Sequence, residues 1–412
     1  MTKCNTQRFF ESTFVNLLKI DKSGGGLEWA ACERIHGNDW GEPTGPIAQA
    51  YDGLYVFEQP AGTIRLVNSA GFNSWVSDIN GKIDGSSSFS SSGAPFVYLN
   101  THGAAATSDY LYLGQNKFDA ATGAYIKNLN LSWTNAFNAG DWGVAAGGES
   151  FDYISNLDHF NRWDDTSSAV TINKTDFTFR QSPDRNRTLL DDGTYYYPWF
   201  TNGTTEGIAQ VAISDLSIID TFVDNTSGLG AGGARQAVRD GLLVYSSGAN
   251  WSLIETATMS DLWEETDDWL GSTFNGVTGL DCCSEFAVAC GNPAADKANT
   301  VVARDLNGDL LWGVEIPLVV GPGSTHLTAR PIISQDESLV FLVGAIQLDS
   351  SSSYYQAIAA LDATDGSVVW SLRHVGGPRR AYGDLSDWGV NLIESGSSIY
   401  LAKRSHRGPT YR

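Results

Sequence analysis

The sequence repeats one short turn pattern, in which a Gly is followed four residues later by a Trp. An Asp or Asn stands shortly before the Gly, and apolar runs lie on both sides. Complete copies are Asp21/Gly25/Trp29, Asn68/Gly71/Trp75, Asp305/Gly308/Trp312 and Asp362/Gly366/Trp370, and a fifth copy, Asp119/Gly123, has Lys127 in the Trp place. Two short β runs around a Gly turn form a hairpin. Because one hairpin cannot bury both its faces, the copies are expected to stack as units of a single repetitive fold.

The composition favours many short strands joined by turns. The chain has 44 Gly and only 18% charged residues, and no long amphipathic helical pattern stands out. A length of 412 residues would otherwise suggest two or three domains. The repeat explains that length, so residues 1–412 are predicted to form one domain.

Seven four-strand units can be traced within residues 45–374. Most are placed by their turns, including the Asp-Gly pairs at 52–53, 192–193 and 240–241, which suit a two-residue hairpin turn with positive φ. The second of these seven units is expected to begin with a strand at 96–100. The fourth is expected to use 188–190 as its first strand and 195–200 as its second.

The two ends of the chain each supply half of an eighth unit. Residues 14–33 form one hairpin with no strand pair before it, and residues 389–403 form a strand pair with no hairpin after it. Eight units in 412 residues gives about 51 residues each, close to the period of four-stranded propeller blades. We therefore predict an all-β, eight-bladed β-propeller of antiparallel blades, whose ring is closed by one blade shared between 14–33 and 389–403.

The turn pattern resembles the repeat of the quinoprotein-like (PQQ-like) β-propeller superfamily, most closely at 361–370 and 20–29. The resemblance spans the whole chain in its spacing, although only four or five of the eight units keep the signature. In that family the Trp packs between neighbouring blades. The resemblance therefore implies blade-docking roles for Trp29, Trp75, Trp312 and Trp370.

The same family contains quinone-dependent dehydrogenases, some of which hold the cofactor under a disulfide between adjacent cysteines. Cys282 and Cys283 stand on the first strand of a unit, as in those enzymes, which gives a PQQ-dependent oxidoreductase as one alternative. The calcium and base motifs of those enzymes have no match here, and adjacent residues on a strand point to opposite faces. We therefore expect no cofactor and no catalytic residue.

Other candidate sites have structural explanations. Residues 305–309 alternate oxygen-bearing side chains, as a calcium loop does, but they occupy the repeated hairpin turn, so no metal site is expected. A second repeat, Asp-Trp-Gly, stands just before three first strands, with a partial copy before a fourth. Its tryptophans either pack on the neighbouring blade or line a recognition surface; they are Trp40, Trp142, Trp269 and Trp388.

The charge and the composition guide the functional prediction. A formal net charge of -21 repels phosphate, so nucleic acid and anionic membranes are poor partners, and neither a signal peptide nor an apolar span is recognisable. Richness in Gly, Ser, Asn, Thr and aromatic residues resembles phage tail and virion-surface proteins. We expect a non-enzymatic binding or assembly module of a virion, contacting other virion proteins or a host surface glycan, with a cytosolic protein-interaction scaffold as a further alternative.

Overall fold

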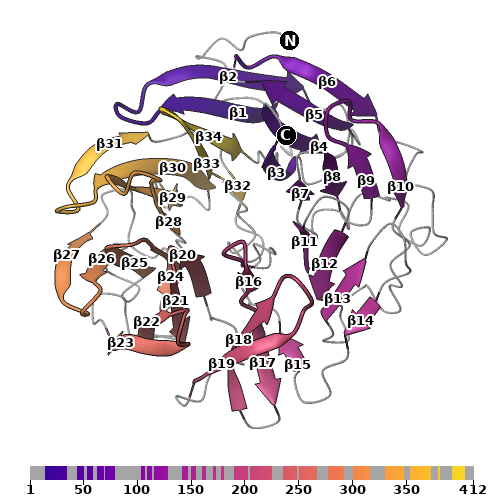
Figure 1. The fold of residues 1–412 in the computed structure, drawn as a ribbon. Helices are drawn as coiled ribbons and strands as arrows, with labels where there is room; N and C mark the ends of the chain where they lie inside the picture. Colours follow the sequence, from indigo (N-terminus) through magenta and orange to yellow (C-terminus); the bar gives the residue numbers. More distant parts are fainter. Residues whose placement is uncertain are drawn as a thin grey trace.

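The computed structural model contains strands and turns, arranged around a circle (Figure 1). The structure describes residues 14–34, 44–50, 53–58, 63–68, 70–78, 104–106, 109–113, 116–128, 142–146, 150–154, 160–163, 170–172, 178–180, 190–202, 205–224, 235–247, 250–266, 277–291, 300–315, 330–347, 353–372, 379–380 and 392–403. Within these ranges there is no helix, and so none that could cross a membrane. The prediction of an all-β chain is confirmed.

The strands of the first half pair into four antiparallel sheets, numbered here in chain order. Sheet 1 contains β1 (Phe14–Asp21), β2 (Leu27–Arg34), β33 (Leu392–Ser395) and β34 (Ser398–Lys403). Sheet 2 contains β3 (Thr44–Ala50), β4 (Gly53–Glu58), β5 (Thr63–Asn68) and β6 (Asn73–Asp78). Sheet 3 contains β7 (Ala104–Ala106), β8 (Tyr110–Leu113), β9 (Asn116–Asp119) and β10 (Tyr125–Asn128). Sheet 4 contains β11 (Trp142–Ala146), β12 (Ser150–Ile154), β13 (Phe160–Trp163) and β14 (Val170–Ile172).

The second half continues the same arrangement. Sheet 5 contains β15 (Thr178–Arg180), β16 (Tyr195–Tyr196), β17 (Trp199–Asn202), β18 (Thr205–Ala212) and β19 (Ile218–Asp224). Sheet 6 contains β20 (Arg235–Arg239), β21 (Leu242–Ser247), β22 (Asn250–Glu255) and β23 (Ser260–Thr266). Sheet 7 contains β24 (Val277–Cys282), β25 (Phe286–Gly291), β26 (Thr300–Asp305) and β27 (Leu310–Glu315). Sheet 8 contains β28 (Arg330–Ile333), β29 (Leu339–Gln347), β30 (Ser353–Asp362), β31 (Val368–Leu372) and β32 (Arg379–Arg380).

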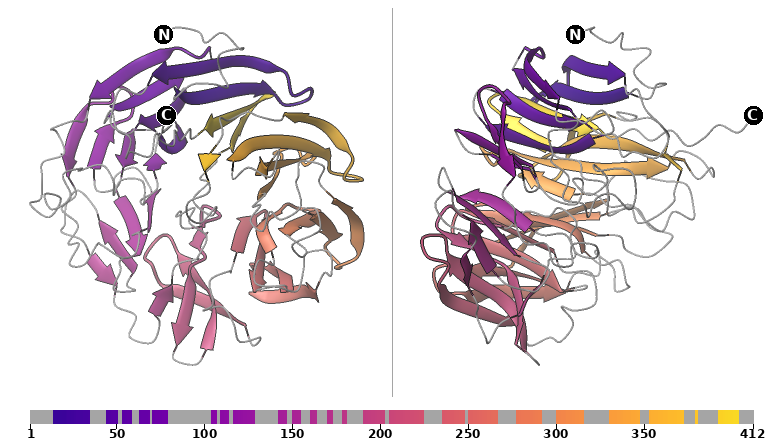
Figure 2. Two further views of the ribbon diagram at one scale, coloured as in Figure 1. Left: turned by 180° about the vertical axis from the view of Figure 1, so that it is seen from behind. Right: turned by 90° about the vertical axis from the view of Figure 1, so that its right-hand side faces the viewer.

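The two ends of the chain meet in sheet 1. Strand β1 pairs antiparallel with β34, with Leu18 opposite Leu401 and Ile20 opposite Ile399, and the backbone N–H of Lys22 donates to the carbonyl of Ser397 at 2.9 Å. The sheet order β2-β1-β34-β33 places the N-terminal hairpin outside the C-terminal one. Figure 2 shows this sheet from behind and from the side, between sheets 8 and 2.

The apolar core lies between neighbouring sheets, because successive residues of a strand face opposite ways. In β26, Val301 packs in a cluster with residues of sheet 8, whereas Val302 packs in a cluster with residues of sheet 6. Both side chains are fully buried. Sheet 7 is therefore apolar on both faces, and sheet-on-sheet packing holds sheets 6, 7 and 8 together.

The strands predicted for sheets 3 and 5 match the described strands only in part. The first described strand of sheet 3 is Ala104–Ala106, and 96–100 lies outside the described residues. In sheet 5 the strand β15 (Thr178–Arg180), which was not predicted, pairs with β17. Of the strand predicted at 188–190 only Leu190 is described; its carbonyl accepts from the backbone N–H of Tyr197 at 3.0 Å, and the next residue, Asp191, bridges Tyr196. The predicted strand at 195–200 is divided into β16 and β17 around Pro198, whose ring removes a backbone donor from the ladder.

Candidate functional site

The tryptophans of the repeat lie at the boundaries between sheets. The indole N–H of Trp312 donates to the carbonyl of Ala363 at 2.8 Å, and that of Trp370 donates to the carbonyl of Lys22 at 2.9 Å. Each acceptor belongs to the turn between the third and fourth strands of the next sheet. Both rings are buried, so each Trp fills an intersheet space and fixes its neighbour's turn by a hydrogen bond.

The Gly of each turn provides the surface on which the Trp of the preceding sheet rests. A Cβ added at Gly366 would lie 2.6 Å from Trp312 Cε3, and one at Gly25 would lie 2.6 Å from Trp370 Cδ2. Trp29 contacts Gly71 in the same way. These Gly residues also have positive φ, so close approach and backbone conformation both require the absence of a side chain.

Sheet 6 contains a docking Trp that the sequence pattern missed. Trp263 donates its indole N–H to the carbonyl of Asp305 at 3.0 Å and packs on Gly308. It stands four residues after Met259, which takes the Gly place with a φ of 46°. The repeat pattern has Gly at that place, so Trp263 does not match it, although its spacing of four from a turn residue is the same.

The size of the residue in the Gly place depends on whether the preceding sheet has a Trp in its Trp place. Sheet 5 has Asp220 in its Trp place, and the Met259 side chain of sheet 6 packs instead among Trp199, Phe222 and other buried residues at that boundary. Leu216 of sheet 5 likewise has positive φ and a buried side chain. A small turn residue accompanies a Trp, and a large one fills the space where the Trp is missing.

The Asp side chains of the repeated turns accept hydrogen bonds from the backbone of their own turns. Asp305 Oδ1 accepts hydrogen bonds from the backbone N–H of Asn307 at 2.8 Å and of Asp309 at 2.9 Å, and Asp362 Oδ1 accepts one from Thr364. Such bonds stabilise tight turns. Within the described ranges, no group of three His, Cys, Asp or Glu side chains is placed to hold a metal ion.

The adjacent cysteines are free, buried and directed to different sides of sheet 7. Cys282 Sγ lies 3.6 Å from the carbonyl of Leu242 in sheet 6, whereas Cys283 packs in the cluster shared with sheet 8. Burial raises the pKa of the Cys283 thiol to about 11 and raises the pKa of Cys282 well above its ordinary range. Neither thiol is available as a reactive thiolate, and their packing opposes a disulfide between them.

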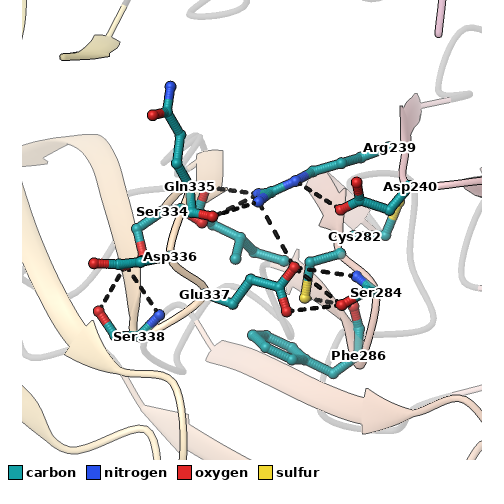
Figure 3. Close-up of polar contacts among 12 residues, drawn as sticks. Arg239, Asp240, Cys282, Ser284, Phe286, Ser334, Gln335, Asp336, Glu337 and Ser338 are labelled. Carbon is teal, nitrogen blue, oxygen red and sulfur yellow. Dashed lines mark hydrogen bonds and ion pairs between the residues drawn. The ribbon is translucent and has the colours of Figure 1, made fainter. Parts of the chain in front are cut away.

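A polar cluster joins the inner turns of sheets 6, 7 and 8 (Figure 3). We call Arg239, Asp281, Ser284 and Glu337 the inner-turn cluster. Arg239 donates from Nη1 to the carbonyls of Ile333 at 3.2 Å and Ser334 at 3.1 Å, and from Nη2 to that of Gln335 at 3.1 Å. Its Nη2 also lies 3.7 Å from Glu337 Oε1, and Ser284 Oγ donates to Glu337 Oε2 at 3.0 Å.

Within this cluster, the carboxylate of Asp281 bonds to the backbone of sheets 7 and 8. It accepts backbone N–H bonds from Ile333 at 2.6 Å and from Cys282 at 2.9 Å. Burial raises its pKa to about 6, and the two N–H donors and the charge of Arg239 limit that rise. Because the cluster's donors and acceptors are directed at one another and at the backbone, its evident role is to lock three neighbouring sheets together.

A second charged group ties sheet 1 to sheet 8. Lys22 Nζ lies 2.7 Å from Asp336 Oδ2 and 2.6 Å from Glu394 Oε1. Burial lowers the pKa of Lys22, but the hydrogen bonds to both carboxylates outweigh it and leave that pKa raised. The bond from Lys22 also lowers the pKa of Asp336. This ion-pair network joins the two ends of the chain to their neighbour.

Comparison with known proteins identifies the fold. No protein family and no curated protein matches the chain. Among solved structures, dihydro-heme d1 dehydrogenase NirN in complex with DHE aligns over 88% of this chain and 74% of its own, with a TM-score of 0.50 at 12% identity. The chain is a β-propeller. The Dos1 propeller aligns over 91% of this chain and 83% of its own, with a TM-score of 0.46 at 12% identity, and Hsv2p of Kluyveromyces lactis aligns over 77% and 75%, with 0.37 at 10%.

Most of the tryptophans predicted for a recognition surface lie outside the described part of the propeller. This applies to Trp40, Trp269 and Trp388. The backbone of Trp142 begins β11 opposite Ile154, and the backbone of Trp75 lies in β6 opposite Leu66; the side chains of both also lie outside the described part. Whether the Asp-Trp-Gly repeat forms a recognition surface therefore stays a prediction.

Large apolar side chains are exposed along the outer strands of the propeller. Among the residues whose side chains are described, each exposed residue of this kind lies on or beside the fourth strand of its sheet; the set is Leu27, Phe72, Ile126, Ile219, Val223, Leu262, Leu310, Leu311, Val368 and Val369. The outer strands carrying them, β2, β6, β10, β19, β23, β27 and β31, follow the rim in Figure 1. The rim therefore presents repeated apolar side chains to the solvent.

Proposed function

We propose that this chain is an eight-bladed propeller, closed by the sheet that both chain ends share, and that it acts as a non-enzymatic binding or assembly module. The observation that carries the proposal is the row of exposed apolar side chains on the outer strands. Repeated apolar exposure on a soluble domain is typical of an interaction surface. Function is assigned here from that surface, because the propeller fold by itself serves many activities.

The side chains best suited to chemistry favour binding over quinone-dependent oxidation. The two adjacent thiols are buried on opposite sides of sheet 7, whereas the resemblance to quinoproteins would require them to be joined beneath a cofactor. Arg239 is directed at three backbone carbonyls and at neighbouring carboxylates. A cofactor enzyme needs groups that position the cofactor and a base together, and these residues are engaged in holding the sheets.

Within the binding class we propose a structural component of a virion, on the tail or the capsid surface. The support is compositional: the chain is rich in Gly, Ser, Asn, Thr and aromatic residues, and its net charge is -21. Its partners would be other virion or assembly proteins, or a host surface glycan. A cytosolic interaction scaffold would use the same outer surface, and incorporation into particles separates the two.

Two assays test the proposal. Purified protein supplied with quinone and calcium should neither retain a quinone absorbance nor reduce a dye in the presence of alcohols or sugars, and a Cys282→Ser/Cys283→Ser variant should behave identically. Particles purified from the source should contain the protein at a fixed stoichiometry. Dye reduction that depends on both quinone and calcium would contradict the binding proposal, and absence from particles would contradict the virion assignment.

A further inference from the structure

The outer strands of every sheet except sheet 4 share a β-bulge immediately before the Trp place. In β31 the register passes from Val368, opposite Leu361, to Trp370, opposite Ala360, so Val369 has no partner. The same shift leaves Leu311 unpaired in β27 and Leu262 unpaired in β23. It recurs in β2, β6, β10 and β19, where the extra residues are Glu28, Ser74, Ile126 and Ile219.

The bulge turns its extra residue outward, and in four consecutive sheets that residue is large and apolar. We call Ile219, Leu262, Leu311 and Val369 of sheets 5 to 8 the bulge arc. These side chains are between 43% and 53% exposed. In sheets 1 and 2 the bulge residue is instead polar, and Glu28 is engaged by Lys19 at 2.8 Å and by Ser398 at 2.6 Å. The apolar bulge residues of sheets 5 to 8 therefore form one continuous run along the rim. Ile126 of sheet 3 is also an apolar bulge residue, but it lies outside this run and its strand carries Lys127.

The Trp docking contacts described above fix the positions of neighbouring arc strands relative to one another. Leu262 and Leu311 each precede a docking Trp, and those rings bond to the turns of sheets 7 and 8. In Figure 1 the strands β19, β23, β27 and β31 follow one another along the outside. Leu310 and Val368, beside the bulges, are also about half exposed, so the arc is widened along its strands.

The charged residues of the arc strands are all acidic. The described side chains of these strands include one carboxylate in β19, three in β23 and one in β27, and their sequences contain no Lys or Arg. The carboxylates are Asp220, Asp261, Glu264, Glu265 and Glu315. One nearby cation, Arg304 of β26, lies 3.8 Å from Glu265. The surface thus combines apolar side chains with a negative border.

We propose that the bulge arc docks a protein partner whose contacting surface is apolar and bordered by Lys or Arg. The inference rests on the proposed binding function and adds the surface and the partner's chemistry. Complementary charge selects such a partner and rejects wrong ones. A second copy docking arc to arc would place like charges together, and the bulges interrupt the ladder that an added strand would need.

The test uses the full chain and a synthetic probe of the stated chemistry. The probe is a fluorescent amphipathic helical peptide of Leu and Lys, and its charge control replaces every Lys by Glu. The arc variant carries Ile219→Ser, Leu262→Ser, Leu311→Ser and Val369→Ser. The matched control carries the same change at exposed apolar sites outside the arc: Leu27→Ser, Phe72→Ser and Ile126→Ser. Circular dichroism confirms that each variant folds, and the single variants Leu311→Ser and Val369→Ser are used if the fourfold one does not.

Fluorescence anisotropy should show that the wild-type chain binds the Leu/Lys peptide and not the Leu/Glu peptide, with affinity falling as salt is added. The arc variant should bind at least about tenfold more weakly, and the control variant should match the wild type. Equal loss in both variants, or binding of the Leu/Glu peptide, would overturn the proposal. So would a wild-type dimer in sedimentation that the arc changes abolish, because the occupant would then be a second copy.

Failure of this inference can be separated from failure of the proposed function. If wild-type and arc-variant chains enter particles equally, the module binds through another surface and the arc inference is wrong. If the wild-type chain enters no particle and binds neither peptide, the binding function itself is contradicted.

Discussion

Because Trp312 rests on Gly366, replacing this Gly by Ala should destabilise the protein more than the same change at Gly193. Gly366 and Gly193 both have positive φ, 72° and 85°, so Ala at either position should cost about 1 to 2 kcal/mol in backbone strain. At Gly366 the new Cβ would also lie 2.6 Å from Trp312 Cε3 and 3.0 Å from Val314 Cγ1, whereas at Gly193 no heavy atom lies within 4 Å. Overpacking of this kind costs about 1 to 3 kcal/mol.

Gly366→Ala should therefore lower the free energy of unfolding by about 1 to 3 kcal/mol more than Gly193→Ala. Urea unfolding followed by Trp fluorescence measures both values. In a Trp312→Leu background the extra loss at Gly366 should shrink, because the ring that meets the new methyl is gone. Equal losses at the two glycines would show that the Trp does not rest on the turn and would refute the docking account.

Three further predictions concern the other contacts. Met259→Gly should destabilise the protein by about 2 to 5 kcal/mol, because the buried Met side chain fills the place of a missing Trp; stabilisation in urea unfolding would contradict this. Lys22→Met should be most destabilising between about pH 5 and pH 9. In the folded protein the pKa of Asp336 is lowered from 3.8 and that of Lys22 is raised from 10.5. The difference in free energy of unfolding between Lys22→Met and the wild type should therefore become smaller below pH 3.8 and at strongly alkaline pH. A difference at pH 2 as large as that at neutral pH would contradict the role of the ion-pair network. The pKa of Asp281 is raised from 3.8 to about 6 in the folded protein. Its contribution to the free energy of unfolding is therefore full below pH 3.8 and is lost as the pH rises through 6, by up to about 3 kcal/mol. Asp281→Asn should remove this pH dependence from urea unfolding curves recorded between pH 4 and pH 7.

Local patterns were sufficient to predict an all-β propeller. Alternating apolar residues and turn residues are read from neighbours in sequence, and the Asp-Gly pair at 240–241 does occupy positive φ at both residues, as a two-residue hairpin turn requires. Trp263 could not be predicted from the repeat pattern, because Met259 stands in the place of its Gly. The first strand of sheet 5 was missed because Thr178–Arg180 is short and no turn pair follows it directly.

The polar contacts of the candidate site could not be read from local sequence. Arg239 reaches carbonyls that lie 94 to 96 residues away, and Lys22 reaches Glu394, which is 372 residues away. Such pairs depend on how sheets stack around the circle. The bulge arc could be predicted only in part. Its apolar residues are visible in the sequence, but only the strand register shows that they point outward.

The pairing of the two chain ends is the central structural claim, and one cross-link tests it directly. Leu17 of β1 lies opposite Ala402 of β34, and cross-strand neighbours are close enough for a disulfide. In a chain with Cys4 and Cys32 changed to Ser, the Leu17→Cys/Ala402→Cys pair should oxidise fully in the folded state, as measured by peptide mass mapping, and should raise the unfolding midpoint. A folded protein in which these two thiols remain reduced under the same oxidant would contradict the closed ring.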